Sequence, residues 1–298
     1  MKTYRLLLVF VCVAFRLSAQ QDPINVLYLN NPITINPAYA GANSMLNAGI
    51  QYRTQWVGAE SNPTTFNFNS HMSVLNDKAG VGIMVMQDRI GDSKSTSVNT
   101  MYAYKIRFKW ATMSFGMQAG FTRYTSDPNL LTIRDNGDPS FNPIRVTNFN
   151  IGSGLLFKGD HWQAGVSAPR MLPASMSQSG TTIKLYDQNY YFFGSYGIFL
   201  SEKFRLRPSV LMRASPGLPL SADVSASLVV QENYSAGLFT RNLNTYGLQF
   251  IAVINDLKLG YVFELPGPSS SNLNFSSHEF MLTLSMGVMR SHDKVNKL

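Results

Sequence analysis

The sequence predicts an all-β protein, a transmembrane antiparallel β-barrel of about fourteen strands with both termini on the periplasmic side. Only 14% of the residues are charged while 12% are aromatic, and the mean hydropathy is −0.05. Soluble domains carry roughly 25% charged residues. Apolar and polar residues alternate in segment after segment, and the connections between segments are alternately short and long. A barrel with a lipid-facing outside and a wet inside accounts for all three observations.

The first 19 residues have the organisation of a secretory signal peptide. Lys2 and Arg5 form a basic start, residues 6–15 form an apolar core, and residues 17–19 offer a cleavage site before Gln20. A membrane helix is the alternative, but ten apolar residues are too few to cross roughly 30 Å of hydrocarbon. We therefore expect Sec-type export and cleavage, followed by insertion into the cell outer membrane.

Removal of residues 1–19 changes both the cysteine content and the charge. The single cysteine, Cys12, lies in this segment, so the mature chain has no disulfide, iron–sulfur cluster or thiol nucleophile. Lys2, Arg5 and Arg16 leave with it, so 22 basic and 17 acidic residues remain and the net charge falls from +8 to +5. The basic residues are scattered and form no blocks, and we expect no nucleic-acid partner.

Alternation with period two defines the strands. In residues 98–108, Tyr102 and Ile106 fall on one face while Asn99 and Lys105 fall on the other. Residues 113–122 and 280–288 repeat this pattern. Segments of about 8–15 residues suit a tilted membrane strand, whereas strands of soluble proteins more often have about five or six residues. We predict strands near 45–53, 64–75, 78–88, 95–108, 111–125, 147–158, 161–168, 188–200, 203–214, 220–230, 233–241, 246–254, 257–264 and 277–288.

The connections between these segments fall into two classes. Tight turns follow every even-numbered segment, at Asn76-Asp77, Lys109-Trp110, Gly159-Asp160, Ser201-Glu202, around Glu232 and at Asn255-Asp256. Longer connections follow the odd-numbered segments, at 54–63, 89–94, 126–146, 169–187, 215–219, 242–245 and 265–276. Short periplasmic turns and longer outer loops are typical of outer-membrane barrels, whereas a soluble sandwich has no reason to separate its connections in this way.

We therefore divide the chain into a signal peptide (1–19), an irregular N-terminal segment (20–44), the barrel (45–288) and a polar C-terminal tail (289–298). Pro32, Pro37 and Gly41 make the segment 20–44 irregular. Within a membrane barrel such a segment either lies in the periplasm or folds into the lumen as a plug.

The polar faces of the predicted strands carry charged residues. They could select a permeant, but buried charges more often pair and brace a barrel. The basic ones are Arg53, Lys105, Arg107, Arg205, Arg207, Arg213 and Arg241, and the acidic ones are Asp223, Glu264 and Glu279. Aromatic residues near the strand ends suit the girdles at the two membrane interfaces, although ordinary packing explains some of them. They are Tyr52, Trp56, Tyr124, Trp162, Tyr190, Tyr234, Tyr246 and Tyr261.

The sequence gives no sign of catalysis, and we expect no enzyme activity, no cofactor and no metal. His71, His161, His278 and His292 have neither zinc spacing nor a nucleophile motif around them. Asp127, Asp135 and Asp138 could offer oxygen ligands to calcium from the connection 126–146. Their spacing is not that of a known calcium loop, and a plain polar loop is the simpler expectation.

A series of short motifs runs along the mature chain. They are Asn36-Pro37-Ala38-Tyr39-Ala40-Gly41, Tyr52-Arg53-x-Gln55-Trp56-Val57-Gly58, Pro63-Thr64, His71, Gly80-Val81-Gly82, Asp88-x-Ile90-Gly91, Pro208-Ser209-x-Leu211, Gly217-x-Pro219 and Ser277-His278-Glu279. In this order they resemble the PorP/SprF family, outer-membrane proteins of the type IX secretion and gliding system of Bacteroidetes. One departure is that the chain continues past its last strand to Leu298.

The resemblance implies a non-enzymatic barrel that helps a large secreted protein, often an adhesin, across or onto the outer membrane. It implies outer-membrane lipid, secretion components and, for some members, a periplasmic peptidoglycan-binding protein as partners. The resemblance further implies that the passenger is held through its C-terminal sorting domain. The candidate functional residues that the resemblance suggests are Asn36, Pro37, Ala38, Tyr39, Gly41, Arg53, Trp56, Ser277, His278 and Glu279.

Two other functions stay open at this point. A passive or fatty-acid-type channel would conduct in planar bilayers and bind no passenger. A surface adhesin or receptor would use the outer loops to bind a glycan or host protein, and its deletion would cause no secretion defect.

Overall fold

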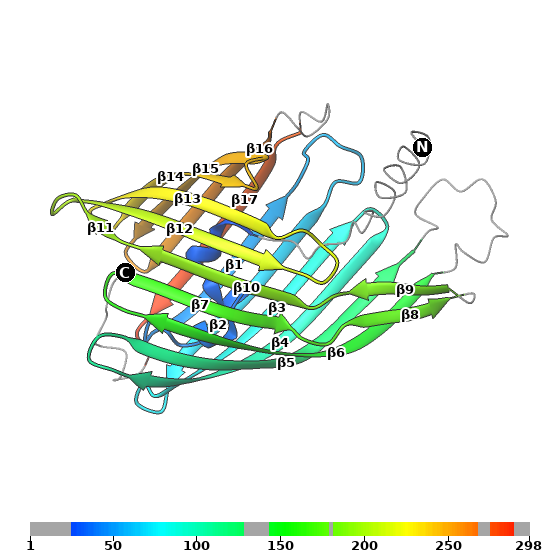
Figure 1. The fold of residues 1–298 in the computed structure, drawn as a ribbon, viewed down its shortest axis with the longest axis horizontal. Helices are drawn as coiled ribbons and strands as arrows, with labels where there is room; N and C mark the ends of the chain where they lie inside the picture. Colours follow the sequence, from blue (N-terminus) through cyan, green and yellow to red (C-terminus); the bar gives the residue numbers. More distant parts are fainter. Residues whose placement is uncertain (1–24, 128–142, 179–180, 268–274, 289–298) are drawn as a thin grey trace, which may run out of the picture.

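The computed structural model describes residues 25–127, 143–178, 181–267 and 275–288. These residues form a closed antiparallel barrel of fourteen strands (Figure 1). The strand that follows β7 in the sheet is interrupted at Gly197 and therefore carries two labels, β10 and β11. The predicted antiparallel barrel of about fourteen strands is confirmed.

Three short 3-10 helices precede the barrel, η1 (Val26–Leu29), η2 (Pro32–Thr34) and η3 (Pro37–Tyr39). The strands are β1 (Leu46–Thr54), β2 (Thr64–Val74), β3 (Ala79–Ile90), β4 (Ser93–Arg107), β5 (Thr112–Ser126), β6 (Ile144–Lys158), β7 (Trp162–Arg170), β8 (Ala174–Gln178), β9 (Thr181–Tyr186), β10 (Asn189–Tyr196), β11 (Ile198–Phe199), β12 (Phe204–Ala214), β13 (Ser221–Val230), β14 (Tyr234–Arg241), β15 (Thr245–Ile254), β16 (Leu257–Pro266) and β17 (Ser277–Met286).

The barrel closes by pairing its first strand with its last. Leu46 of β1 lies opposite Met286 of β17, and the register runs to Thr54 opposite His278. The remaining barrel strands pair with their neighbours in the chain, except that β10 follows β7 because β8 and β9 form a separate hairpin. Closure leaves no unpaired sheet edge in lipid, which a membrane strand cannot tolerate.

The alternation of side chains explains why these strands form a membrane barrel. On β4, Tyr102 and Tyr104 are exposed on the outer surface, whereas Asn99, Ala103 and Lys105 are buried on the inner face. Apolar residues thus face lipid and polar residues face the interior, the reverse of a soluble core. Within the described part of the chain, no helix has the length and apolarity needed to cross a membrane.

Outward aromatic residues lie near both ends of the barrel, as the sequence predicts. Near the tight turns, the ring of Trp110 stacks on Trp162 at 6.1 Å and on Phe108 at 6.0 Å. At the opposite end, Tyr52 and Tyr246 are exposed. Both sets occupy the positions where amphipathic rings meet the membrane–water boundary.

The predicted connections need three corrections. The connection 89–94 shrinks to residues 91–92 and 242–245 shrinks to 242–244, because the strands continue further than the alternation indicates. Gly91, at φ +60°, supplies the left-handed conformation that such a tight turn needs. The unbroken alternation of short and long connections is therefore wrong at these two places. The predicted long connection 169–187 contains the hairpin β8–β9, which was not among the predicted strands.

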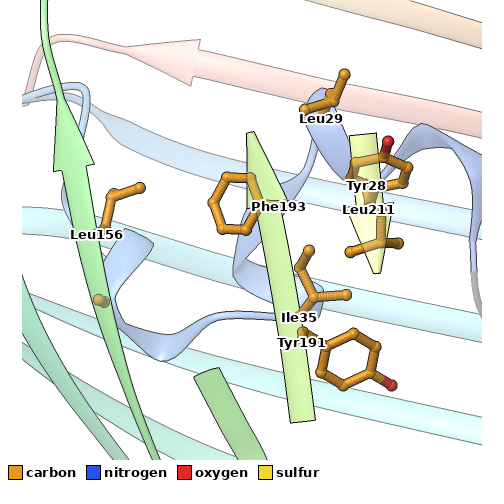
Figure 2. Packing of buried hydrophobic residues seen from close by; sticks show 8 residues of the cluster. Tyr28, Leu29, Ile35, Leu156, Tyr191, Phe193 and Leu211 are labelled. Carbon is orange, nitrogen blue, oxygen red and sulfur yellow. The ribbon is translucent and has the colours of Figure 1, made fainter. Parts of the chain in front are cut away.

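Residues 25–44, called here the N-terminal segment, lie inside the barrel (Figure 1). Figure 2 shows one of the apolar clusters that hold the segment. Tyr28, Leu29 and Ile35 pack on inward-facing residues of the wall, namely Leu156, Tyr191, Phe193 and Leu211. A second cluster joins Val26 and Leu27 to the wall residues Phe239, Ile251, Val262 and Met281, and a third joins Ile33 and Ala40 to Met84, Met101 and Ala103.

Candidate functional site

A buried cluster of charged residues inside the barrel is centred on Arg53 of β1. Its side chain is 2% exposed and lies between two carboxylates, with Glu264 of β16 at 3.0 Å and Glu279 of β17 at 3.1 Å. The pairing of β1 with β17 places Arg53 directly opposite Glu279. Two residues that are far apart in the sequence therefore form a buried ion pair where the barrel closes.

Glu279 also holds the start of the N-terminal segment. Its two carboxylate oxygens accept the backbone N–H groups of Val26, at 2.8 Å, and Leu27, at 3.0 Å. The side-chain amide of Gln51 donates a further bond at 2.6 Å. These N–H groups are the first of η1 and have no partner within the helix, so the carboxylate satisfies them.

Asn36 fixes the middle of the segment to the opposite wall. Its amide nitrogen donates to the carbonyl oxygens of Leu155, at 3.1 Å, and Val166, at 3.4 Å, while its side-chain oxygen accepts the N–H of Ala38 at 2.9 Å. Asn36 is fully buried. One side chain thus caps η3 and ties it to β6 and β7.

Residues 36–41 pack against three inward-facing glycines of the wall, Gly80, Gly116 and Gly154, called here the glycine floor. A Cβ added to Gly116 of β5 would lie 2.1 Å from the backbone nitrogen of Ala38, and one added to Gly80 of β3 would lie 2.0 Å from the carbonyl oxygen of Ala40. A Cβ on Gly154 of β6 would lie 2.1 Å from the side-chain oxygen of Asn36. The segment can approach the wall this closely only because these positions lack side chains.

Gly41 joins the segment to β2 and β4 of the wall. Its φ of +68° is in the left-handed region, and its N–H donates to Nδ1 of His71 at 3.1 Å. The carbonyl oxygen of Gly41 accepts a bond of 2.7 Å from Lys105, whose ammonium also pairs with Asp77 at 2.5 Å. His71 therefore acts as a structural acceptor that holds the end of residues 36–41.

Tyr39 of η3 packs edge-on against His71, with the ring centroids 5.8 Å apart. Burial raises the pKa of Tyr39 to about 12, although the neighbouring Arg207 guanidinium acts in the opposite direction. The phenol is therefore neutral at physiological pH and does not balance the charge of Arg207.

Trp56, Ser277 and His278 form a second group, at the rim. The backbone N–H of Trp56 donates to the hydroxyl of Ser277 at 3.2 Å, and the Trp56 side chain is 48% exposed. His278 faces away from Glu279, with Nδ1 2.9 Å from the hydroxyl of Tyr261 and Nε2 3.1 Å from that of Ser276. The structure thus divides the predicted candidates between the lumen and the rim.

The expectation that interior charges pair is confirmed for several residues. Besides Arg53, Arg241 pairs with Asp223 at 2.8 Å, Arg205 pairs with Glu232 at 2.6 Å, and Arg107 pairs with Asp77 at the barrel end. In the described ranges, no group of three or more histidine, cysteine, aspartate or glutamate side chains is arranged to hold a metal ion. Asp135 and Asp138, considered as calcium ligands, lie outside the described residues, as does His292.

The sequence reasoning missed two parts of this site. Gln51 joins Glu279 to the side-chain amides of Asn25 and Asn31, at 3.1 and 3.4 Å. The glycine floor was not predicted either, although the inner faces of the predicted strands contain glycine at regular intervals. Inward glycines next to a proline-rich segment are the signal that could have revealed this packing.

The barrel is similar to several solved outer-membrane proteins at low sequence identity. The toluene transporter TbuX of Ralstonia pickettii has a TM-score of 0.49 and 10% identity, over 86% of this chain and 93% of that one. The toluene transporter TodX of Pseudomonas putida has a TM-score of 0.46 and 10% identity, over 86% and 92%. BamA of Haemophilus ducreyi lacking POTRA domains 1–3 has a TM-score of 0.44 and 9% identity, over 82% and 70%.

No curated protein matches the sequence significantly. A family model does match, that of the type IX secretion system membrane protein PorP/SprF, over residues 17–284. This range includes all fourteen barrel strands and the N-terminal segment, apart from the end of β17. The chain belongs to the PorP/SprF family of type IX secretion system membrane proteins.

Proposed function

We propose that this protein is a non-enzymatic platform at the outer membrane that holds a large secreted protein by its C-terminal sorting domain. The observation that carries the proposal is the N-terminal segment, which occupies the barrel interior in a member of a secretion family. A barrel with a filled interior cannot be the conduit for a folded passenger. The passenger then binds to the outside of the barrel and crosses the membrane elsewhere in the machinery.

The distribution of contacts supports a closed lumen. The segment is bonded to Glu279 on β17, to backbone oxygens on β6 and β7, and to Lys105 on β4. Its three apolar clusters involve a further set of wall residues around the barrel. Attachment on several sides favours a fixed plug over a loose tail, because all these contacts must break before the segment can leave.

The end of the barrel with the long connections offers a supported surface for a passenger. The hydroxyl of Tyr186, at the end of β9, donates to Ser95 of β4 at 2.5 Å, and the Arg170 guanidinium lies 4.1 Å from the Tyr186 ring centroid. These contacts tie the hairpin β8–β9 to the wall. Binding residues are commonly carried by loops on a rigid scaffold, and the exposed Trp56 lies at this same end.

We place the tight turns in the periplasm, together with both termini after cleavage of residues 1–19. There they are accessible to secretion components and to a periplasmic peptidoglycan-binding protein. This orientation directs the hairpin β8–β9 and Trp56 to the cell surface.

The test is an affinity pull-down of the tagged barrel from native outer membranes, with identification of its partners by mass spectrometry. We expect a large secreted protein with a C-terminal sorting domain, together with secretion components. A second chain, with residues 174–186 replaced by a short Gly-Ser linker, should lose the passenger and keep the periplasmic components. Folding of both chains is checked by heat-modifiable migration on gels.

Recovery of a folded barrel without a secreted protein, under conditions that retain other membrane complexes, would contradict the platform. Conductance of that barrel in planar bilayers would then favour the channel. Normal surface secretion after gene deletion, with loss of binding to a glycan or host protein, would favour the adhesin.

A further inference from the structure

The interior of the barrel has an uneven charge distribution along its axis. Arg53 and Arg241 have carboxylate partners in the half nearer the long connections. At the end with the tight turns, Lys158, Arg207 and Lys258 also point inward, as the alternation on β6, β12 and β16 requires. Within the described ranges, none of these three side chains has an ion pair.

The hydrogen bonds that these cations make to the described residues are long. Among the described residues, Lys158 donates only to the carbonyl oxygen of Ala42, at 3.4 Å, and Arg207 only to the side-chain oxygen of Asn30, at 3.5 Å, while Lys258 donates to no side chain or carbonyl there. Arg207 also has a buried Nε with no partner. A cation removed from bulk water is costly unless it is paired and hydrogen-bonded. Among the described residues, Lys158, Arg207 and Lys258 therefore lack acidic partners that would offset this cost.

Two of the three cations line a cavity of about 90 Å³. Arg207 and Lys258 border it together with Arg205, whose own Nε has no partner. Glu232 is the acidic residue in the lining, and it pairs with Arg205 at 2.6 Å. The lining also includes His161, Gln163 and Asn233, and the N-terminal segment contributes Leu29, Asn30 and Tyr39. Because Tyr39 is neutral, the cavity keeps an excess of positive charge.

We propose that this cavity binds an oxyanion, a phosphate or carboxylate group, between Arg207 and Lys258. The volume is about three times the roughly 30 Å³ that a water molecule occupies in the liquid, which is enough for such a group. A guanidinium presents a planar fork of donors that suits two oxygens of one anion, and an ammonium adds a point charge. Trp162 and Tyr234, next to tight turns, also line the cavity and place it at that end of the barrel.

The bound anion would contact both the wall and the N-terminal segment, since Asn30 and Tyr39 form part of the lining. It would therefore strengthen the attachment of the segment in a region where the hydrogen bonds are long. The anion could be free phosphate or the carboxylate of an acidic residue on a protein at the tight-turn end. Both sources offer the same chemistry to the site.

The experiment is isothermal titration calorimetry on the purified, detergent-solubilised mature protein. Inorganic phosphate is one probe and the capped dipeptide acetyl-Glu-Glu-amide is the other. We expect saturable binding of at least one probe. Arg207→Gln and Lys258→Gln, tested separately, should each weaken it by at least about tenfold, because a hydrogen bond to a charged group contributes that much.

Lys109→Gln is the matched control, since Lys109 is an exposed cation in the turn between β4 and β5 at the same end of the barrel. This variant should bind like the natural chain. Binding of phosphate alone would identify a free anion as the ligand, and binding of the dipeptide alone would identify a protein carboxylate. Absence of saturable binding with both probes, or equal affinity in all three variants, would overturn the proposal. Heat-modifiable migration checks folding, and either cavity variant suffices if the other does not fold.

Discussion

Arg53 lies between two carboxylates, and its single charge balances only one of them. The remaining negative charge is stabilised by the backbone N–H groups of Val26 and Leu27 and by the Gln51 amide, all of which donate to Glu279. The N-terminal segment therefore completes the electrostatics of the wall. This arrangement explains why a basic residue on the first strand and an acidic one on the last belong to one site.

Replacement of Arg53 tests this interdependence. Arg53→Met keeps much of the apolar stem but leaves Glu264 and Glu279 without a cation in a buried site. Breaking a buried ion pair on one side costs about 3–5 kcal/mol, and we expect the free energy of unfolding to fall by that amount. The measurement is urea unfolding in lipid vesicles, followed by tryptophan fluorescence.

Arg107→Met is the matched control, because the Arg107 side chain is 59% exposed in its pair with Asp77. Exposed pairs contribute about 0–1 kcal/mol, so this variant should unfold almost like the natural chain. Equal losses in the two variants would show that burial of the Arg53 cluster has no special importance.

At the scale of the elements, the N-terminal segment and the wall are matched in shape. The segment contains three short 3-10 helices and no strand, and its path over residues 36–41 follows from the glycines beneath it. A side chain at Gly80 or Gly116 would collide with backbone atoms, which cannot rotate away as a flexible side chain can, and one at Gly154 would collide with the buried side chain of Asn36. The glycine floor thus selects where the segment lies.

Gly116→Ala should therefore dislodge the segment. The new Cβ would lie 2.1 Å from the nitrogen of Ala38, and overpacking of this kind typically costs about 1–3 kcal/mol. We expect faster cleavage of residues 25–44 by added protease while the barrel itself resists. Gly194→Ala is the control, since the nearest atom to its Cβ would be 3.8 Å away. Equal protease resistance in both variants would refute the proposed packing.

The hairpin β8–β9 offers a separate test of an element. Tyr186→Phe removes only the hydrogen bond to Ser95, whereas Tyr186→Ala also removes the ring beneath Arg170. We expect proteolysis within residues 174–186 to be slightly faster in the first variant and much faster in the second. Unchanged cleavage in Tyr186→Ala would mean that these contacts do not hold the hairpin.

The alternation of side chains predicted all fourteen barrel strands, because each must present an apolar face to lipid along its whole length. It did not predict β8 and β9, which form a hairpin outside the barrel sheet and so have no lipid-facing pattern. The predicted strand 78–88 also ends too early, since β3 continues to Ile90.

The site was less predictable than the fold. Motif resemblance selected Arg53 and Glu279 together, but only the closure of the barrel explains their contact. It also selected Trp56, Ser277 and His278, which lie at the rim and do not contact the N-terminal segment through any described hydrogen bond. The contacts of Gly80, Gly116 and Gly154 depend on the three-dimensional path of residues 36–41, which the pattern of inward glycines suggests but does not fix.

At the scale of the whole molecule, the barrel encloses a segment of its own chain, residues 25–44. Apolar side chains face lipid, polar and glycine positions face inward, and the N-terminal segment takes up interior surface that water would otherwise occupy. The family match assigns the protein to the membrane proteins of type IX secretion. A filled barrel in a secretion system fits a holding role better than a transport role.

The most direct test of this account is the conductance of the mature protein in planar lipid bilayers. The protein is compared with a chain that lacks residues 25–44, after heat-modifiable migration has shown that both are folded. We predict a closed natural barrel and a steady, ion-conducting pore in the shortened chain. A natural chain that conducts as well as the shortened one would contradict the claim that the N-terminal segment closes the lumen.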